Sequence, residues 1–247
     1  MRNLRSTAGL TLLEVVIAVS LLSLLMVGVM TSLRLGLSAW GKTNTKLMDN
    51  RRVAGAQRVL EQQLEGFMPV IALYAAAPDA PPTVKMPFFQ GEPQSMRFVS
   101  SYSLQEAGRG YPRILEFQVI PGKDGKGVRL VVNENLYTGP PSAGFFCLGK
   151  VTDPASGAVS FRFRPIEVGP RSFVLADRLA SCSFSYQETP PPPAPTQWTT
   201  NWVSPRWPGA IRIEMTPFDD QTVRLRPISV TAQMHVNRYP IFEYGDY

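Results

Sequence analysis

One carboxylate at the head of a long uncharged stretch constrains this chain more than any other feature. Glu14 is followed by nineteen residues, Val15 to Leu33, without a charge. A stretch of this length is sufficient to cross a bilayer as a helix. A charged side chain at mid-bilayer costs roughly 2.5–3.5 kcal/mol on insertion scales, so it is rarely present without a partner or a purpose. The sequence therefore predicts a transmembrane segment over residues 10–33, in which Glu14 has a function.

The residues before Glu14 form a short motif. Gly9 is followed by Leu10-Thr11-Leu12-Leu13-Glu14, and residues 1–9 carry Arg2 and Arg5 and no acid. This spacing of glycine, apolar stretch and glutamate resembles the class III leader of type IV pilins and type II secretion pseudopilins. The resemblance implies that residues 1–9 are a leader peptide, which a prepilin peptidase removes by cutting between Gly9 and Leu10. It further implies that Leu10 becomes a methylated N-terminus and that Glu14 becomes an assembly contact.

Two other N-terminal signals fit parts of this pattern. A secretory signal peptide has a shorter apolar core of 7–15 residues, and a plain signal anchor has the right length, but neither explains Glu14. Basic residues do not decide the orientation, because Arg34, Lys42 and Lys46 outnumber the two arginines of the leader. The orientation therefore follows from the leader: a single pass through the bacterial inner membrane, with the C-terminal domain in the periplasm.

The remainder of the chain divides into a helix and a strand-rich domain. No proline occurs from Leu10 to Pro69, and several apolar residues recur at helical spacing (Val53, Ala56, Leu60, Leu64 and Phe67). We expect one long helix over residues 10–68, which Gly28, Gly36, Gly41 and Gly55 can bend or locally melt. Alternation then predicts a hairpin of 115–119 and 128–132, with further strands at 96–102, 159–163, 172–175, 181–186, 210–215 and 228–236. The predicted fold class is α+β: a long N-terminal helix packed on a mainly antiparallel sheet domain of residues 69–247, as in pilins.

Charge limits the partners of that domain. Residues 1–68 hold eight Lys/Arg and four Asp/Glu, whereas residues 69–247 hold seventeen and fifteen. The second part is nearly neutral, and it has no clustered basic footprint for nucleic acid. Its alternating arginines (Arg162, Arg164, Arg171 and Arg178) are typical of a solvated sheet face. Pro190–Pro193 and Pro195 predict an extended loop spacer.

Two cysteines lie in the domain that the leader places in an oxidising compartment. Cys147 and Cys182 can form a disulfide there or remain two buried thiols, and the sequence leaves both open. The single histidine, His235, lies in an alternating apolar segment and favours a structural role.

The motifs of known catalytic and cofactor sites are missing from the sequence. One histidine excludes the HExxH zinc pattern, and neither a G-x-S-x-G elbow nor a phosphate-binding glycine loop occurs. Asp219-Asp220 lacks the spacing of a calcium loop and favours a turn. We therefore expect no enzyme activity, no catalytic residues, no metal and no cofactor.

The C-terminal half resembles one branch of the pilin superfamily. An aromatic strand ending in Tyr186 is followed by tryptophans and by a proline-containing turn into an apolar strand (Trp198, Trp202 and Trp207-Pro208-Gly209-Ala210-Ile211-Arg212-Ile213). This order is similar to that of the J-type minor pseudopilin, although Trp207 stands where a leucine is more usual. The resemblance implies a structural subunit of the pseudopilus tip. Its implied partners are the I- and K-type minor pseudopilins, the major pseudopilin and secreted substrates.

Three functions are compatible with the sequence. The first is a minor pseudopilin of type II secretion, which primes assembly and helps to drive protein export. The second is a minor pilin of a type IV pilus or DNA-uptake machine, although the near-neutral domain argues against DNA. The third, a membrane-anchored periplasmic enzyme, is disfavoured by the missing motifs.

Overall fold

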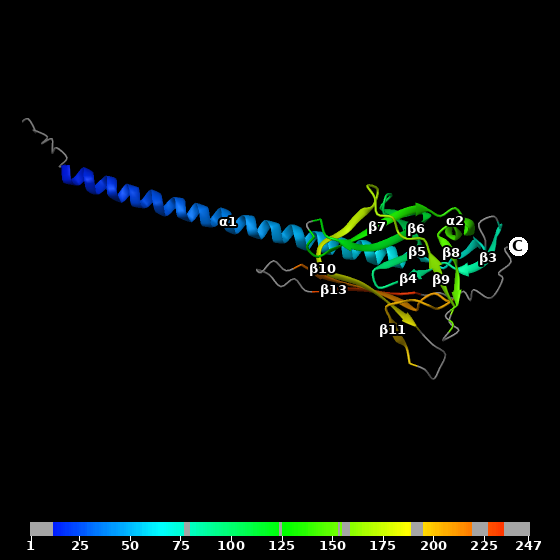
Figure 1. Cartoon of the computed structure of the whole chain (residues 1–247). Helices are drawn as coiled ribbons and strands as arrows, with labels where there is room; N and C mark the ends of the chain where they lie inside the picture. Colours follow the sequence, from blue (N-terminus) through cyan, green and yellow to red (C-terminus); the bar gives the residue numbers. More distant parts are fainter. Residues whose placement is uncertain are drawn as a thin grey trace, which may run out of the picture. The chain divides into compact units, whose positions relative to one another are not determined.

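The computed structural model describes residues 12–76, 80–123, 125–152, 154, 159–188, 195–218 and 227–234, and of residues 39–54 the backbone alone. It contains a long N-terminal helix and a mainly antiparallel β-domain, so the predicted α+β class is confirmed (Figure 1). The chain divides into two compact units, one up to Arg52 and one from Val53 onward.

Helix α1 spans Leu12–Glu65, and the glycines do not interrupt it. The prediction that the helix extends to residue 68 is wrong at its end. Gly66 follows α1, and Phe67 already pairs with Ser100 in a strand. A side chain at Gly66 would place its Cβ 2.5 Å from Ser100 Oγ. This close approach of backbone to sheet requires glycine and ends the helix before Pro69 does.

The β-domain is built on one nine-stranded antiparallel sheet. Its main strand order is β1-β5-β6-β7-β10-β12-β13, with β4 beside β5 and β11 beside β10. The bounds are β1 Phe67–Met68, β4 Gln90–Gly91, β5 Ser95–Ser103, β6 Gly108–Pro121, β7 Val128–Leu136, β10 Phe173–Glu188, β11 Gln197–Thr199, β12 Ala210–Pro217 and β13 Ile228–Gln233.

The predicted hairpin is confirmed as β6 and β7, and it is longer than predicted. The turn between them requires glycine at Gly127, where φ is +63° and a Cβ would lie 2.2 Å from the Leu179 carbonyl oxygen. The two predicted strands at 172–175 and 181–186 are one strand, β10. Register shifts between Val174 and Ser181 bend this strand without ending it.

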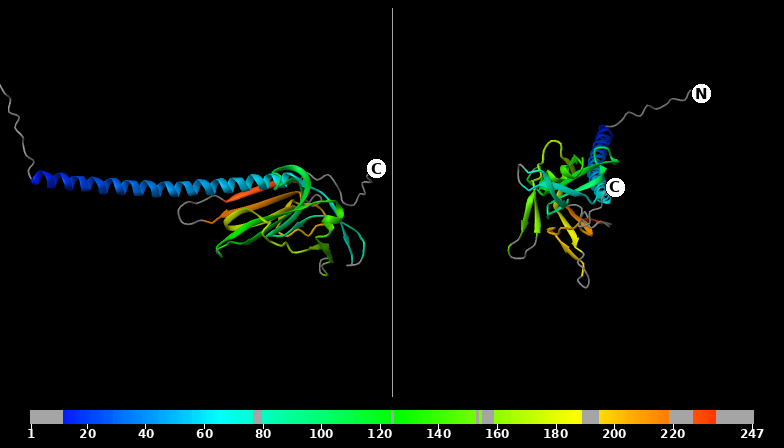
Figure 2. Two further views of the ribbon diagram at one scale, coloured as in Figure 1. Left: turned by 90° about the horizontal axis from the view of Figure 1, so that it is seen from above. Right: turned by 90° about the vertical axis from the view of Figure 1, so that its right-hand side faces the viewer.

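The strands curve around the last turns of α1 (Figures 1 and 2). Ala56, Leu60 and Leu64 are buried in a core with one side of β5, β6 and β7 and with β10, β12 and β13. We call this side of β5–β7 the helix face. It confirms the apolar helix stripe at these three positions, while Phe67 packs against the same core from β1.

The opposite side of β5–β7 is covered by two groups of elements, of which the sequence predicted only the strand at 159–163, with the bounds that the structure has. One is the hairpin of β2 (Ile71–Ala75) and β3 (Pro82–Pro87). The other, which we call the lobe, consists of helix α2 (Pro140–Gly144), strands β8 (Cys147–Thr152) and β9 (Val159–Phe163), and residues 164–172. We call this side of β5–β7 the lobe face. Gly144 is essential to the packing, because a Cβ there would lie 1.7 Å from the Leu73 carbonyl oxygen.

Candidate functional site

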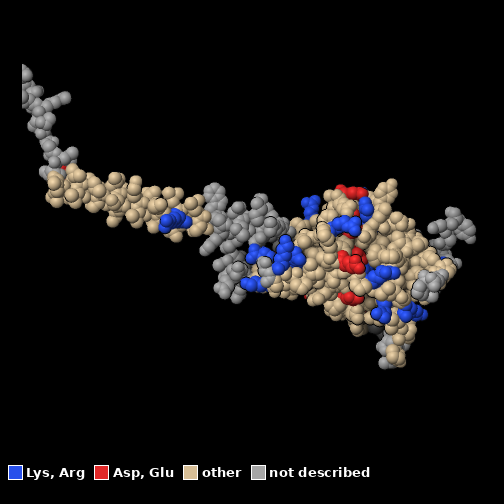
Figure 3. All heavy atoms as spheres, turned by 45° about the horizontal axis from the view of Figure 1, so that its top comes forward, with Lys and Arg blue, Asp and Glu red and all other residues tan. Residues whose placement is uncertain are grey.

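The N-terminal part of α1 is suited to a membrane. Residues Leu12–Ser38 are long and apolar enough to span one, with a mean hydropathy of 2.6. Their described side chains are exposed within this chain, and Figure 3 shows a surface almost without charge there. The apolar stretch thus extends past Arg34, five residues beyond the predicted end at Leu33.

The predicted processing and assembly residues lie at the beginning of this segment. Glu14 is in the first turn of the described helix, where a carboxylate is favoured by the helix dipole. Gly9 and Leu10 lie outside the described residues, so cleavage and methylation stay predictions. A shallow apolar groove follows the helix farther along, where small side chains recur every four residues at Gly28, Ser32 and Gly36. Small residues at this spacing let helices approach closely in membranes.

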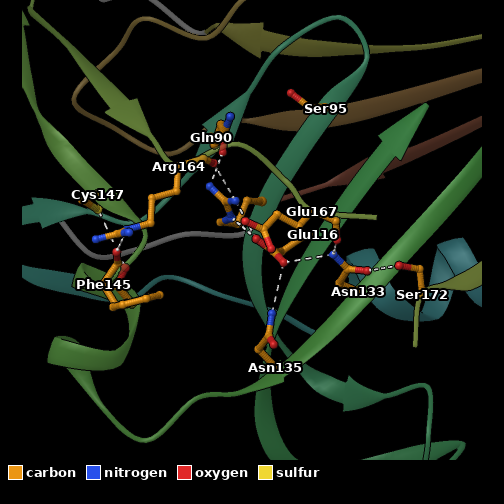
Figure 4. Close-up of polar contacts among 12 residues, drawn as sticks. Gln90, Ser95, Glu116, Asn133, Asn135, Phe145, Cys147, Arg164, Glu167 and Ser172 are labelled. Atoms are coloured by element: carbon orange, nitrogen blue, oxygen red, sulfur yellow. Dashed lines mark hydrogen bonds and ion pairs between the residues drawn. The ribbon is translucent and has the colours of Figure 1, made fainter. Parts of the chain in front are cut away.

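The lobe face contains a row of polar residues across four strands. Gln90 on β4 is opposite Arg97 on β5, Arg97 is opposite Glu116 on β6, and Glu116 is opposite Asn133 on β7. We call these four residues the polar row, and Figure 4 labels Gln90, Glu116 and Asn133. Arg97 is fully buried and Glu116 nearly so. The row was not predicted from the sequence, because charges alternating with apolar residues in a strand ordinarily indicate a solvated face.

Every part of the buried ion pair has hydrogen-bonding partners. Arg97 donates from Nε (2.8 Å) and Nη2 (2.5 Å) to Glu116 Oε1, and from Nη1 to Gln90 Oε1 at 2.6 Å. Glu116 Oε2 accepts from the side-chain amides of Asn133 (3.2 Å) and Asn135 (3.1 Å). Burial lowers the pKa of the Arg97 guanidinium, and the adjacent Glu116 carboxylate opposes that shift. Removing either partner would leave a buried charge unpaired.

The polar row holds the lobe against the sheet. Arg97 Nη2 donates to the Arg164 carbonyl oxygen at 3.0 Å, and Asn133 Nδ2 donates to that of Glu167 at 2.9 Å. Ser172 Oγ donates to Asn133 Oδ1 at 2.6 Å. The Arg97 guanidinium also lies 4.9 Å from the centroid of the Phe146 ring. The arrangement can orient backbone and position a surface loop, which is a structural task rather than acid–base chemistry.

The two cysteines are both free and buried, so the structure does not form the disulfide that the sequence left open. Cys147 belongs to the apolar cluster of the lobe face, whereas Cys182 belongs to the core of the helix face. Burial raises the pKa of each thiol to about 12, which Arg97 opposes at Cys147. Both are therefore protonated and poorly reactive at neutral pH.

The aromatic residues behind the J-type resemblance pack around β10. Tyr186 is buried and donates from its hydroxyl to the Glu92 carbonyl oxygen at 2.9 Å. Its ring and that of Trp202 both contact Phe89 edge-on. Trp207 is buried, and Trp198 lies under the Arg212 guanidinium at 3.9 Å. The tryptophans thus fasten the segment between β10 and β12 to the core.

Residues 12–76, 80–123, 125–152, 154, 159–188, 195–218 and 227–234 contain no group of three or more His, Cys, Asp or Glu side chains that could hold a metal ion. Asp219, Asp220 and His235 lie outside these residues, as does most of the proline run.

The comparisons with known proteins leave the family open. No protein-family model matches the chain, and no curated protein matches it.

Proposed function

We propose that this chain is a minor pseudopilin of a type II secretion system, a structural subunit of the pseudopilus tip that primes assembly and helps to drive protein export. The observation that carries the proposal is Glu14 at the head of an uncharged, membrane-compatible helix, five residues after Gly9. In this role the prepilin peptidase cuts after Gly9 and Leu10 is methylated. The subunit is held in the inner membrane with the β-domain in the periplasm.

The order of elements supports the proposal. One helix, α1, contains the apolar segment and then supplies Ala56, Leu60 and Leu64 to the core of an antiparallel domain. This is the pilin-like plan expected from the leader. The small residues along the membrane segment suit close packing against the helices of other subunits. The partners in this role are the I- and K-type minor pseudopilins and the major pseudopilin.

Glu14 has a physical task in such an assembly. Its carboxylate forms an ion pair with the N-terminal ammonium of Leu10 of an adjacent subunit. The attraction is worth a few kcal/mol at an effective dielectric near 20. Paired buried charges of this kind fix the register between helices. The tip role follows from the tryptophan and tyrosine pattern of the C-terminal half, because that pattern carries the J-type resemblance.

Cleavage of the leader is the first test. Gly9→Ala should leave the full chain uncut when it is co-expressed with a prepilin peptidase, because the enzyme of this family requires glycine at that position. The matched control is Gly28→Ala, a site where an added Cβ meets no atom within 4 Å, and it should be cut normally. The readout is the gel mobility and mass of the N-terminal peptide. Normal cutting of Gly9→Ala would remove the leader assignment.

Assembly is the second test. Glu14→Leu should insert more favourably by roughly 2–3 kcal/mol. It should nevertheless lose co-purification with other minor pseudopilins, since an unpaired ammonium in the tip costs about 3–5 kcal/mol. Ser20→Leu, another polar-to-leucine change in the same segment, is the control and should assemble. Wild-type assembly and secretion by Glu14→Leu would show that Glu14 is not an assembly contact.

A further inference from the structure

The lobe exposes several apolar side chains. Phe145 lies between α2 and β8, and 61% of its surface is exposed, while the next residue, Phe146, packs against buried Arg97. Leu148 and Val151 of β8 are also exposed, at 52% and 41%. Single exposed apolar residues are common on protein surfaces, so exposure alone assigns no role.

Arg164, whose guanidinium lies over the Phe145 ring, is held through both its backbone and its side chain. Arg164 Nε donates to the Phe145 carbonyl oxygen at 2.7 Å, and the guanidinium carbon lies 4.4 Å from the centroid of the Phe145 ring. The backbone N–H of Arg164 donates to the Phe146 carbonyl oxygen at 2.8 Å. Its own carbonyl oxygen accepts from Arg97 Nη2, so the buried polar row fixes the position of this surface arginine (Figure 4). The Arg164 side chain is therefore already ordered in the folded protein. A ligand does not have to immobilise it, which lowers the entropic cost of binding.

The N–H groups of Arg164 that make no hydrogen bond within the described residues indicate which kind of ligand it can bind. Its two Nη groups have no hydrogen-bonding partner among the described residues, whereas Nε is satisfied. A guanidinium fork with free N–H groups matches a carboxylate, which it can bind through two parallel hydrogen bonds. The described lobe residues, 140–152, 154 and 159–172, include four cations (Lys150, Arg162, Arg164 and Arg171) and one acid, Glu167. The surface thus combines positive charge with an exposed aromatic ring.

We propose that Phe145 and Arg164 form a docking site for an acidic segment of another protein. An aspartate or glutamate of that segment accepts hydrogen bonds from the Arg164 Nη groups, and an adjacent apolar side chain packs on the Phe145 ring. Aromatic and arginine anchors that are ordered before binding are typical of the residues that dominate protein interfaces. The site belongs to the β-domain and does not depend on the proposed function.

Site-specific photo-crosslinking of the full chain in membranes of its host tests the site. Phe145→p-benzoylphenylalanine should give a covalent adduct with a protein, and the adduct peptide should contain Asp or Glu. The control is the same replacement at Tyr111, which is more exposed (75%), and it should give little adduct. Adding Arg164→Gln should reduce the position-145 adduct about tenfold, the effect of losing charge-assisted hydrogen bonds. Arg162→Gln removes one positive charge of the lobe but leaves the Arg164 donors in place, so it should reduce the adduct much less than Arg164→Gln does.

A second variant tests the carboxylate directly and does not rely on Arg164→Gln. Arg164→Lys places a primary amine at the site, and a water-soluble carbodiimide should join it to the carboxylate of the partner through an amide bond. Equal adducts at positions 145 and 111, an adduct that persists unchanged in Arg164→Gln, or no amide bond to lysine at position 164 would each overturn the proposal. An adduct only with lipid or nucleic acid would do the same. These readouts are separate from cleavage after Gly9, so the two proposals can fail independently.

Discussion

The two faces of β5–β7 are formed by alternate residues of the same strands, yet they are stabilised in different ways. The helix face is apolar: Phe98 and Phe117 stack with ring centroids 5.6 Å apart under the leucines of α1. The lobe face combines an apolar cluster with the polar row, where Arg97 and Glu116 are almost completely removed from water. An apolar face tolerates many packings, whereas a buried ion pair requires every hydrogen bond to be made. The difference suggests that the helix face supplies stability and that the lobe face fixes one position of the lobe.

The largest effect is expected from breaking the ion pair. Arg97→Met leaves Glu116 buried without its cation and should lower the free energy of unfolding by about 3–5 kcal/mol. The double variant Arg97→Met/Glu116→Leu removes both charges and should recover most of that loss. Urea unfolding of the full chain in detergent, followed by tryptophan fluorescence, measures both. Arg162→Met, at an exposed arginine, is the control, and a double variant no more stable than the single one would contradict the prediction.

On the helix face, Leu60→Ala should lower the free energy of unfolding by about 3 kcal/mol, because Leu60 is fully buried and its truncation leaves a cavity. Arg58→Ala, on an exposed side of the same helix, should cost little.

Limited proteolysis under native conditions distinguishes the faces. Arg97→Met should expose the lobe to cutting before the domain unfolds, whereas Leu60→Ala should not. Selective cutting of the lobe in Leu60→Ala would disprove the division between the faces.

Each of the two faces packs against an apolar cluster that contains one cysteine, Cys182 for the helix face and Cys147 for the lobe face. The unfolded thiols lose their protons above about pH 9, whereas the folded thiols keep them until about pH 12. The unfolded chain therefore binds fewer protons in this range, and the free energy of unfolding falls as pH rises. The expected loss is about 2 kcal/mol per thiol at pH 10.5. Cys147→Ala and Cys182→Ala should each reduce the slope of stability between pH 9 and 11, while a slope equal to wild type would show that burial does not shift that thiol.

The smallest effect concerns a buried amide on α1. Gln63 is fully buried, and neither of its side-chain polar atoms has a hydrogen-bonding partner in the described part of the chain. Gln63→Leu should raise the free energy of unfolding by about 1 kcal/mol, since it removes an unsatisfied polar group. Gln62→Leu, at the half-exposed neighbour, should change it by less than about 0.5 kcal/mol. Thermal unfolding compares the two, and a destabilised Gln63→Leu would indicate that the amide has a partner such as bound water.

The predictable parts of the fold are those with an uninterrupted local pattern. The apolar spacing of Ala56, Leu60 and Leu64 correctly indicated the buried stripe of α1, and alternation along 115–119 and 128–132 correctly indicated the β6–β7 hairpin. The alternating strand β9 was predicted correctly, whereas α2, β8 and the β2–β3 hairpin were missed, because such short elements without clear apolar–polar alternation carry little periodicity. The end of α1 was predicted from Pro69, but a close backbone contact at Gly66 decided it.

By itself, the sequence determined a long apolar segment that begins with one carboxylate, a helical stripe and a strand-rich domain. These follow from the order of side chains along the chain, because membrane solubility and amphipathic periodicity are local properties. Only the tertiary structure decided that Arg97 and Glu116, nineteen residues apart, are opposite each other on neighbouring strands, and that both lie beneath the lobe. It also decided that Cys147 and Cys182 occupy different apolar clusters. Strand register and the packing of other elements on a sheet face bring residues together that are far apart in the sequence. A polar residue in an alternating strand has the same local sequence pattern whether that face is exposed to solvent or covered by another element.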